Sequence, residues 1–408
     1  MKLIGPFRQV VTLANLPLRG SLRDEQLEVI ECAGIVVNAR SIIKVGNFEH
    51  LKQEFPHINI EYIEGEQIAM PAFTDCHTHI CFGGNRANDF SLRNAGKTYL
   101  EIAESGGGIW SSVKHTRETS EADLLKDLLI RIDDLIRQGI TTIEIKSGYG
   151  LKLDCELKML RAINSAKEYT PAKLVPTCLA AHAHPKDFKG GSREYLNYVL
   201  EYILPVVQEE DLAKRVDIFI ETSAFEPEDS RAFLQRAKAM GFHLTVHADQ
   251  FTTGGSRIAV DCGAQSVDHL EATNEGDIRY IAQSNTVAVV LPGASLGLGM
   301  AFAPARKLLD AGAILAIGTD WNPGSAPMGK LIMQASVLAT SQKLSTAEVL
   351  AGICFRAAYA LGFEDRGVLT EGKRADFVCF KTDHYQNVLY RQGGLQPCAV
   401  FIKGQKYA

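Results

Sequence analysis

A His-x-His pair at the end of an apolar run is the feature that most constrains how this 408-residue chain can fold. His77 and His79 follow residues 69–76, which have the length and composition of a β-strand. Residues i and i+2 of a strand project from the same face, so both imidazoles would emerge side by side at its carboxyl end. Two such rings can hold one metal ion, and the pattern therefore predicts a strand that ends in a metal site.

Strand-sized apolar runs recur through the middle of the chain, mostly with helix-like stretches between them. Several runs are apolar almost throughout, which is typical of parallel strands covered on both faces. Eight strands alternating with helices predict an α/β fold, a (β/α)₈ TIM-like barrel over residues 66–363. The predicted strands are residues 69–77, 141–147, 174–182, 216–222, 243–248, 266–271, 287–292 and 313–320. The clearest helical patterns cover residues 121–138, 155–169, 193–208 and 229–240.

The two ends of the chain contain short β-like pieces separated by turn residues. These pieces are residues 27–32, 34–37, 41–45, 58–63, 377–380 and 399–402. Neither end is long enough to form a stable hydrophobic core of its own. We therefore expect residues 1–65 and 364–408 to combine into one small composite β-sandwich domain beside the barrel.

Charge and cysteine usage exclude some classes of partner and compartment. The net charge of −5 is spread without long charged blocks, which argues against nucleic acid or an anionic membrane as the main partner. The nine cysteines form no C-x-x-C pair, and most lie in apolar runs, which favours reduced thiols in the cytoplasm. Polar residues interrupt the amino-terminal apolar stretch, so no secretory signal is expected. Residues 286–305 carry no charge, but their prolines and glycines favour a buried strand and a loop over a membrane span.

Further metal-ligating residues lie at the ends of other predicted strands. In a barrel of this kind, groups at the carboxyl ends of the strands meet at one mouth. His182 ends the third predicted strand, His247 the fifth and Asp320 the eighth, and His269 lies at the sixth. The His-x-His pair with His247 and Asp320 would leave a position open for water, whose pKa a catalytic zinc lowers to about 7. One metal ion is expected, because the fourth strand has no lysine to carbamylate; Glu221 is a conceivable ligand for a second ion.

Alternative roles stay open for several of these residues. Asp320 could instead cap a helix amino terminus. Lys146 could bind an anion at a strand end or simply be solvated. Residues 106–108 could cradle a phosphate, but an ordinary loop fits better because no P-loop Lys-Ser/Thr follows them. His115 and His184 are expected to be structural or surface residues.

With these residues placed, the sequence resembles the amidohydrolase superfamily and, within it, the imidazolonepropionase family, over nearly the whole chain. The His-x-His pair marks only the superfamily. The blocks Ser147-Gly148-Tyr149-Gly150 and Thr319-Asp320-Trp321-Asn322-Pro323-Gly324 are specific to the narrower family. Other matching blocks are residues 71–79, 82–84 with Arg86, 106–109, 180–183, 247–250, 268–271, 291–294 and 367–376.

The resemblance implies an activity and a set of site residues. It implies hydrolysis of the small molecule 4-imidazolone-5-propanoate to N-formimidoyl-L-glutamate, in histidine degradation, by a homodimer with one Zn²⁺ or Fe³⁺ per subunit. The implied metal ligands are His77, His79, His247 and Asp320. The implied substrate contacts are Arg86, Tyr99 and Tyr149 to the propionate, His182 and Gln250 to the ring, and Asn322, Gly324 and Ser325 along the pocket. The implied catalytic groups are Asp320, His269 and Gln250.

Gln250 departs from some members of the family and from most related deaminases, which carry a glutamate at this position. An amide cannot shuttle protons, so Gln250 can orient the ring or the water, and proton transfer falls to Asp320 and His269. The alternative enzyme, an aminohydrolase of another heterocycle, is disfavoured for this reason. Arg86 with Tyr149 favours an acidic substrate instead. An interaction protein that has lost its metal is also disfavoured, because every candidate ligand is present.

Overall fold

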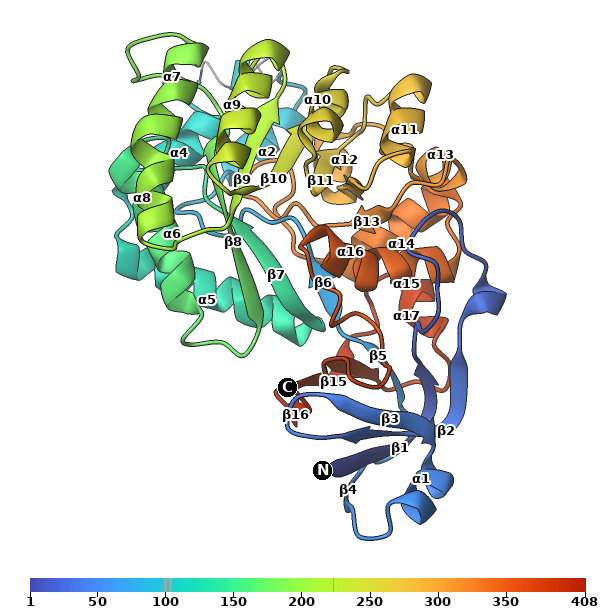
Figure 1. Cartoon of the computed structure of the whole chain (residues 1–408). Coiled ribbons are helices and arrows are strands. Elements are labelled where there is room, and N and C mark those ends of the chain that lie inside the picture. Colours follow the sequence, from blue (N-terminus) through green and yellow to red (C-terminus); the bar gives the residue numbers. More distant parts are fainter. Residues whose placement is uncertain (99–100, 103–104, 223) are drawn as a thin grey trace.

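The computed structural model describes residues 1–98, 101–102, 105–222 and 224–408, and it contains two eight-stranded sheets. In Figure 1, the larger body consists of a strand layer surrounded by helices, and both chain ends lie in the smaller sheet below it. The strands of the larger sheet are parallel and follow one another in chain order from β6 to β13. This architecture confirms the predicted α/β barrel with a small β domain built from both ends of the chain.

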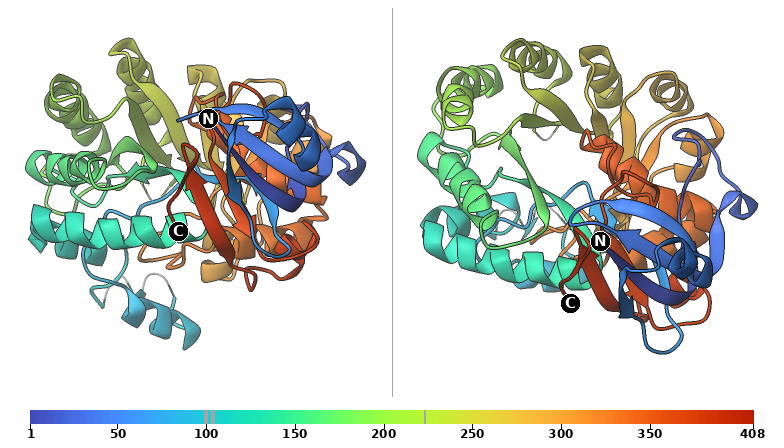
Figure 2. Two further views of the ribbon diagram at one scale, coloured as in Figure 1. Left: turned by 90° about the horizontal axis from the view of Figure 1, so that it is seen from below. Right: turned by 60° about the horizontal axis from the view of Figure 1, so that its bottom comes forward.

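The barrel strands are β6 (Phe73–Asp75), β7 (Ile140–Lys146), β8 (Lys173–Ala181), β9 (Arg215–Ile220), β10 (His243–Ala248), β11 (Ser266–His269), β12 (Val287–Val290) and β13 (Leu315–Ile317). The helices of the same body are α2 (Ala87–Asn94), α4 (Ile109–Glu118), α5 (Glu121–Arg137), α6 (Leu153–Ala166), α7 (Ser192–Tyr198), α8 (Leu204–Glu209), α9 (Pro227–Ala239), α10 (Gly255–Cys262), α11 (Glu275–Ala282), α12 (Pro292–Leu298), α13 (Ala305–Asp310), α14 (Leu331–Gln342), α15 (Thr346–Ile353) and α16 (Phe355–Ala360). A π-helical turn (Val199–Ile203) joins α7 to α8. Figure 2 shows the helices arranged around the strands, which explains why barrel strands such as β7 are buried along their whole length.

Local sequence accounts for helices such as α5. The Ser120 side chain accepts a hydrogen bond from the Asp123 backbone N–H at 3.1 Å and so caps the helix amino terminus. Apolar residues three and four positions apart then form one face that packs on the barrel. The buried residues of this face are Leu124, Leu128, Ile132, Leu135 and Ile136.

The run at residues 69–77, predicted as one strand, is two strands in two different sheets. β5 (Ile68–Pro71) belongs to the smaller sheet, whereas β6 begins the barrel. Ala72 donates its N–H to the Asp376 carbonyl at 3.1 Å, and the next residue, Phe73, donates to Gly139 at 2.8 Å. The prediction of one strand was wrong because both strands are buried and extended, so their hydrophobicity does not show where the pairing partner changes.

The smaller sheet is mixed and draws on both chain ends. Its order is β16-β15-β14-β5-β1-β2-β3, with β4 beside β1. Its strands are β1 (Lys2–Val11), β2 (Val29–Val37), β3 (Ile42–Asn47), β4 (Asn59–Tyr62), β5, β14 (Phe377–Phe380), β15 (Pro397–Ile402) and β16 (Gln405–Lys406). α1 (Phe48–Glu54) packs on this sheet, whereas a short 3₁₀ turn (Asp24–Gln26) contacts α15 and α17 (Asn387–Tyr390) contacts α14 of the barrel body. The division of the chain after residues 65 and 363 stays a prediction.

Sequence analysis missed β1, although β1 pairs with three other strands of this sheet. Gly5 and Pro6 resemble a turn in the sequence. In the structure the register with β2 shifts between Ile4 and Phe7, and this irregularity lets the strand continue past the proline. Phe7 then packs in the core of the sheet with Phe377 and Phe401.

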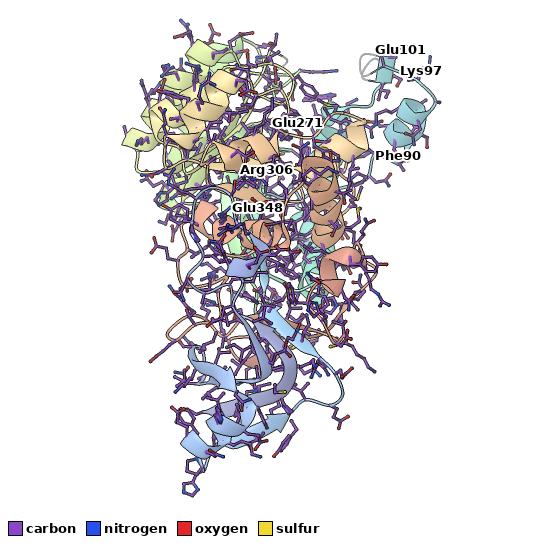
Figure 3. The ribbon with its side chains drawn as sticks, turned by 90° about the vertical axis from the view of Figure 1, so that its right-hand side faces the viewer. Phe90, Lys97, Glu101, Glu271, Arg306 and Glu348 are labelled. Carbon is purple, nitrogen blue, oxygen red and sulfur yellow. The ribbon has the colours of Figure 1, made fainter. Side chains whose placement is uncertain are left out.

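An ion pair on the outside of the barrel links two helices that are distant in sequence. Arg306 of α13 contacts both carboxylate oxygens of Glu348 in α15 at 2.9 Å, and Figure 3 labels the two residues close together. The same view shows that the segment with Phe90, Lys97 and Glu101 stands out from the barrel body.

Residues 286–305 form β12 followed by the short helix α12, where sequence analysis expected a loop. Pro292 occupies the first helical turn, a position that proline favours because its missing N–H has no partner there anyway. Within the described ranges, we find no helix that is both long and apolar enough to cross a membrane.

The barrel closes through backbone hydrogen bonds just beyond the ends of β6 and β13. Asp320 donates its N–H to the His77 carbonyl at 3.0 Å, and His79 donates to the Trp321 carbonyl at 2.9 Å. Thr78 and Trp321 form a parallel bridge between the same segments. The two strands farthest apart in sequence order are therefore adjacent at the carboxyl end of the barrel.

Asp75 strengthens this closure, and its removal is expected to weaken the fold. Its carboxylate accepts hydrogen bonds from the Thr319 N–H at 3.0 Å and the Thr319 hydroxyl at 2.6 Å. Asp75→Ala leaves both buried donors without an acceptor, so we expect the free energy of unfolding to fall by about 1–3 kcal/mol. Urea unfolding measures this change, and Asp383→Ala on the exposed surface serves as the control. Equal stability of the two variants would contradict the role of Asp75.

Candidate metal centre and its pocket

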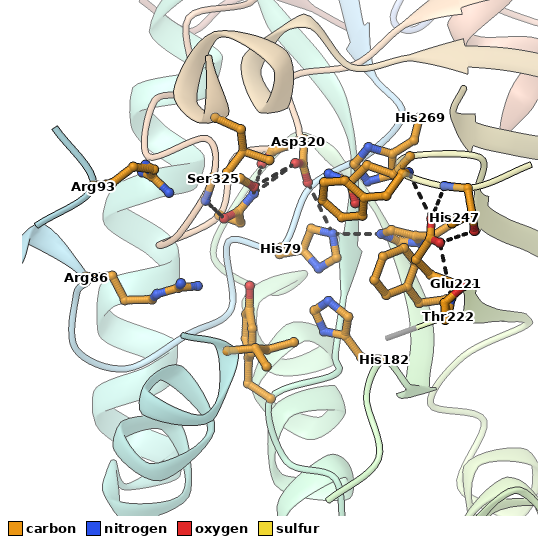
Figure 4. Close-up of a pocket in the computed structure, with 18 residues that line it drawn as sticks. His79, Arg86, Arg93, His182, Glu221, Thr222, His247, His269, Asp320 and Ser325 are labelled. Carbon is orange, nitrogen blue, oxygen red and sulfur yellow. Dashed lines mark hydrogen bonds and ion pairs between the residues drawn. The ribbon is translucent and has the colours of Figure 1, made fainter. Parts of the chain in front are cut away.

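Three histidines and one aspartate converge at the carboxyl ends of the barrel strands, as Figure 4 shows for His79, His247 and Asp320. The Nε2 atom of His79 lies 3.2 Å from Nε2 of His77 and 3.2 Å from Nε2 of His247. Asp320 Oδ1 lies 3.5 Å from His77 Nε2 and 3.4 Å from His79 Nε2. All four side chains are buried.

These separations fit a single metal ion. In a tetrahedral zinc site with Zn–N bonds of about 2.0–2.1 Å, neighbouring ligand atoms lie roughly 3.4 Å apart. One ring nitrogen from each of His77, His79 and His247 lies within 4.8 Å of the others, and Asp320 forms a second such group with His77 and His269. Imidazole and carboxylate ligands suit both zinc and iron, so the donor set accepts either.

His269 lies beside this cluster. One of its ring nitrogens lies within 4.8 Å of His77 and Asp320 ligand atoms, and its Nδ1 is 3.4 Å from Glu271 Oε2. The backbone is left-handed at His269 (φ 88°) and at Asp320 (φ 52°). This conformation costs a non-glycine residue about 1–3 kcal/mol and persists where the surrounding structure holds it, often at functional sites.

The protonation states of His247 and Asp320 suit metal binding. Burial lowers the pKa of His247 to about 4 despite the nearby Asp217, so this imidazole is neutral at pH 7. Burial alone would raise the pKa of Asp320, but hydrogen bonds from His77 and His79 hold that pKa well below its usual range. Neutral imidazole and ionised carboxylate are the forms that bind metal ions. At His77, burial and Lys146 are outweighed by hydrogen bonds to Asp268 and Asp320, which raise its pKa to about 9, so a metal ion would have to displace a proton there.

Carboxylates stand behind two of the clustered histidines. His77 Nδ1 lies 2.6 Å from Asp268 Oδ2, and His247 Nδ1 lies 2.9 Å from Asp217 Oδ2. Such pairs fix the orientation of the ring and leave Nε2 for a metal. Sequence analysis missed both aspartates. The available signal was a charged residue inside an otherwise apolar strand, because such a residue needs a buried partner.

Lys146 lies between these carboxylates. Its Nζ atom is 2.8 Å from Asp217 Oδ2, 2.8 Å from Glu144 Oε2 and 3.7 Å from Asp268 Oδ2, and the side chain has no exposed surface. Both alternatives considered for Lys146 were therefore wrong: it is neither solvated nor open to an external anion. It is an internal counterion for acidic side chains inside the barrel.

A cavity of about 430 Å³ opens beside the cluster. His79, His247, His269 and Asp320 form part of its wall. The predicted substrate-binding residues that line it are Arg86, Tyr149, His182, Gln250, Asn322 and Ser325. Tyr99, another predicted substrate-binding residue, lies outside the described residues. Gly324 instead packs against Arg86, where any Cβ would collide with the guanidinium group.

His182 is held as a neutral ring that faces the cavity. Its Nδ1 lies 3.0 Å from the Gly148 carbonyl, so this nitrogen donates and Nε2 is left as an acceptor. The ring stacks on His79 with 5.2 Å between centroids. Burial lowers the pKa of His182 to about 3, so it stays uncharged at pH 7.

Two arginines lie on the side of the cavity away from His247 (Figure 4). Arg86 donates through Nε to Asp89 at 2.7 Å, and Asp89 also accepts the Gly108 N–H at 2.8 Å. The glycine-rich loop at residues 106–108 thus supports Arg86 through Asp89. The acceptor of the Gly108 N–H is the Asp89 carboxylate and not a phosphate. Sequence analysis missed Arg93, which lies in α2, the helix that Arg86 directly precedes. The available signal was a second arginine about two helical turns farther along the chain.

Asn322 contacts the carboxylate of Asp320. Its Nδ2 donates to Asp320 Oδ2 at 2.9 Å, which leaves Oδ1 facing the histidines. Asp320 does not cap a helix, because the next helix in this fully described part of the chain is α14, which begins at Leu331.

Glu221 is occupied by the loop that follows β10. It accepts hydrogen bonds from the backbone N–H groups of Phe251 at 2.9 Å and Thr252 at 3.2 Å. Glu221 belongs to neither group of described residues that could hold a metal. Its carboxylate is therefore engaged by the backbone of that loop.

The chain matches the model of the Amidohydrolase family over residues 68–406. It is 40% identical over 389 residues to an imidazolonepropionase of Bdellovibrio bacteriovorus, covering 94% of this chain and 91% of the relative. It is 42% identical over 393 residues to an imidazolonepropionase of Rubrobacter xylanophilus, covering 95% and 94%.

Solved structures share the fold at much lower sequence identity. An atrazine chlorohydrolase from Arthrobacter aurescens, complexed with zinc, has a TM-score of 0.72 at 17% identity, covering 100% of this chain and 95% of that one. An adenosine deaminase from Xanthomonas campestris with bound zinc has a TM-score of 0.71 at 18% identity, covering 99% and 92%.

Loss of one ring nitrogen is expected to empty the metal centre. We expect His247→Ala to lose the tightly bound ion, because the three remaining ligands bind the ion less strongly than four ligands do. Elemental analysis after extensive dialysis measures metal per chain. His184→Ala is the matched control: His184 lies 3.1 Å from the Gly190 carbonyl and packs on Tyr195, a structural role as expected. Full metal content in His247→Ala would contradict this assignment.

Proposed function

Since the chain belongs to the amidohydrolase family and, within it, to the imidazolonepropionases, we propose that it hydrolyses 4-imidazolone-5-propanoate to N-formimidoyl-L-glutamate. This reaction opens the imidazolone ring by cleaving one ring C–N bond and belongs to histidine degradation. We further propose that His77, His79, His247 and Asp320 hold one Zn²⁺ or Fe³⁺ per subunit.

The observation that carries the proposal is one cavity with an acidic-substrate side and a hydrolytic side. Arg86 and Tyr149 line the same 430 Å³ cavity as His247 and Asp320. A guanidinium group matches a carboxylate in shape and charge, and a phenol hydroxyl can add a hydrogen bond. The propionate would therefore lie at Arg86 while the ring reaches the metal centre.

The metal and the protein would divide the chemistry. A bound ion would act as a Lewis acid on the ring carbonyl and lower the pKa of water to about 7. Asp320, ionised and oriented by Asn322, accepts the proton of the attacking water. The water oxygen forms a bond to the ring carbonyl carbon, and the C–N bond breaks as the proton passes to the leaving nitrogen. His269 stabilises the charge that develops on the former carbonyl oxygen.

The neutral groups of the pocket position the ring. His182 offers an acceptor nitrogen, and Gln250 offers both a donor and an acceptor. Gln250 cannot carry a proton, which favours ring opening over deamination, where a proton shuttle is required. A deaminase of another heterocycle is the alternative, and its product would be ammonia.

Location and assembly follow from the family resemblance. We propose a cytoplasmic homodimer. All nine cysteines lie in the described part of the chain, and none of them forms a disulfide, which agrees with a reducing compartment.

An assay of ring opening tests the function directly. We expect the metal-loaded protein to remove imidazolone absorbance and form N-formimidoyl-L-glutamate without releasing ammonia. Absorbance loss and ammonia are measured on the same sample, with chelator-treated protein as the control. Ammonia equal to the substrate consumed would favour the deaminase instead.

Replacing the carboxylate of Asp320 by an amide is expected to affect turnover more than replacing the amide of Gln250 by a carboxylate. Asp320→Asn removes the proton acceptor, so we expect turnover to fall by at least about 10²–10⁴-fold. Gln250→Glu keeps the size of the side chain, and we expect it to retain some turnover. Steady-state kinetics with metal content measured for each variant separates loss of the base from loss of the ion. Unchanged turnover in Asp320→Asn would remove the proposed base.

A further inference from the structure

One buried cluster of charges joins both carboxylate–histidine pairs of the metal centre. Lys146, at the end of β7, lies 2.8 Å from Asp217 in β9 and 3.7 Å from Asp268 in β11. It also lies 2.8 Å from Glu144, two residues earlier in its own strand. None of these four side chains is exposed to solvent.

We propose that Lys146 is a positioning residue for the metal centre. Its ammonium group holds Asp217 and Asp268 where they orient His247 and His77, although Lys146 contacts neither histidine itself. The inference rests on the metal centre proposed above. It adds that a residue of β7, a strand that carries none of the proposed ligands, helps to orient two of them.

The physical reason is the repulsion between two carboxylates in a dry interior. Asp217 and Asp268 come from β9 and β11, on either side of β10, and both point toward Lys146. Like charges repel strongly where the dielectric constant is low. Among the described residues, Lys146 is the only lysine or arginine that forms an ion pair with either aspartate.

Without this ammonium, the two aspartates would separate, and each would move away from the ring nitrogen it now faces. The current separations are 2.6 Å for His77 Nδ1 to Asp268 and 2.9 Å for His247 Nδ1 to Asp217. Thr245 donates to Asp268 at 3.1 Å and the His247 backbone N–H donates to Asp217 at 3.2 Å, so each carboxylate would be restrained in part. The imidazole rings of His77 and His247 would then be less well oriented toward the metal ion. Metal affinity would fall although every ligand is still present.

Glu144 provides a matched control, because it contacts Lys146 but neither histidine. Its other contacts are the Thr177 hydroxyl at 2.6 Å and Arg215 Nε at 3.8 Å. Removing its charge disturbs the same buried cluster and leaves both carboxylate–histidine pairs in place.

The test measures zinc affinity by chelator competition on the full chain, with circular dichroism to verify folding. We expect Lys146→Met to raise the Kd for zinc by about 10–100-fold, the range seen when a group that orients a ligand is removed. Glu144→Gln is expected to stay within about threefold of the wild type, since no pair that orients a ligand is changed. The double variant Lys146→Met/Glu144→Gln removes one charge of each sign, and we expect its Kd to rise as in Lys146→Met.

The outcomes distinguish this inference from the metal centre on which it rests. If Lys146→Met does not fold, the double variant decides the question, because it keeps the summed charge of these four groups as it is in the wild type. An unchanged Kd in a folded variant that lacks Lys146, or an equal loss of affinity in Glu144→Gln, would overturn the role of Lys146 alone. A wild-type protein that takes up no zinc would contradict the metal centre as well.

Discussion

Closure of the barrel between its first and last strands is the constraint on which the site depends. The peptide groups of His77 and Asp320 are joined by a hydrogen bond of 3.0 Å. Their side chains therefore start from adjacent backbone positions, although 243 positions separate them in the sequence. A rigid backbone holds ligand atoms more accurately than mobile loops can, and this rigidity suits a metal centre that needs separations near 3.4 Å.

Buried charge is the second recurring feature, and its purpose is orientation. A buried ion pair is weak support for stability, because removing charges from water costs about as much as their attraction returns. Lys146, Asp217 and Asp268 are nevertheless all inside the barrel, directly behind the clustered histidines. Across the cavity from His247, Asp89 holds Arg86 in the same way. His77, His247 and Arg86 are thus each oriented by a carboxylate.

The sequence was most informative where a residue type and its position on a strand agreed. The convergence of His77, His79, His247 and Asp320 could be predicted, since each lies at the end of an apolar run. Prediction failed where the physical cause was a distant partner. The change of sheet within residues 69–77 depends on Asp376 and Gly139, and nothing in the local sequence indicates either one.

By itself, the sequence determined the class of fold, the strand order along the barrel and the residues able to bind a metal, because these follow from periodicity and side-chain chemistry. Tertiary structure decided which of them meet. It placed Lys146 in the interior beside Asp217 and Asp268. It also joined Glu221 to a neighbouring loop by hydrogen bonds and placed Arg93 in the wall of the cavity. These outcomes depend on distances between separate strands, and distances between strands arise only when the barrel closes.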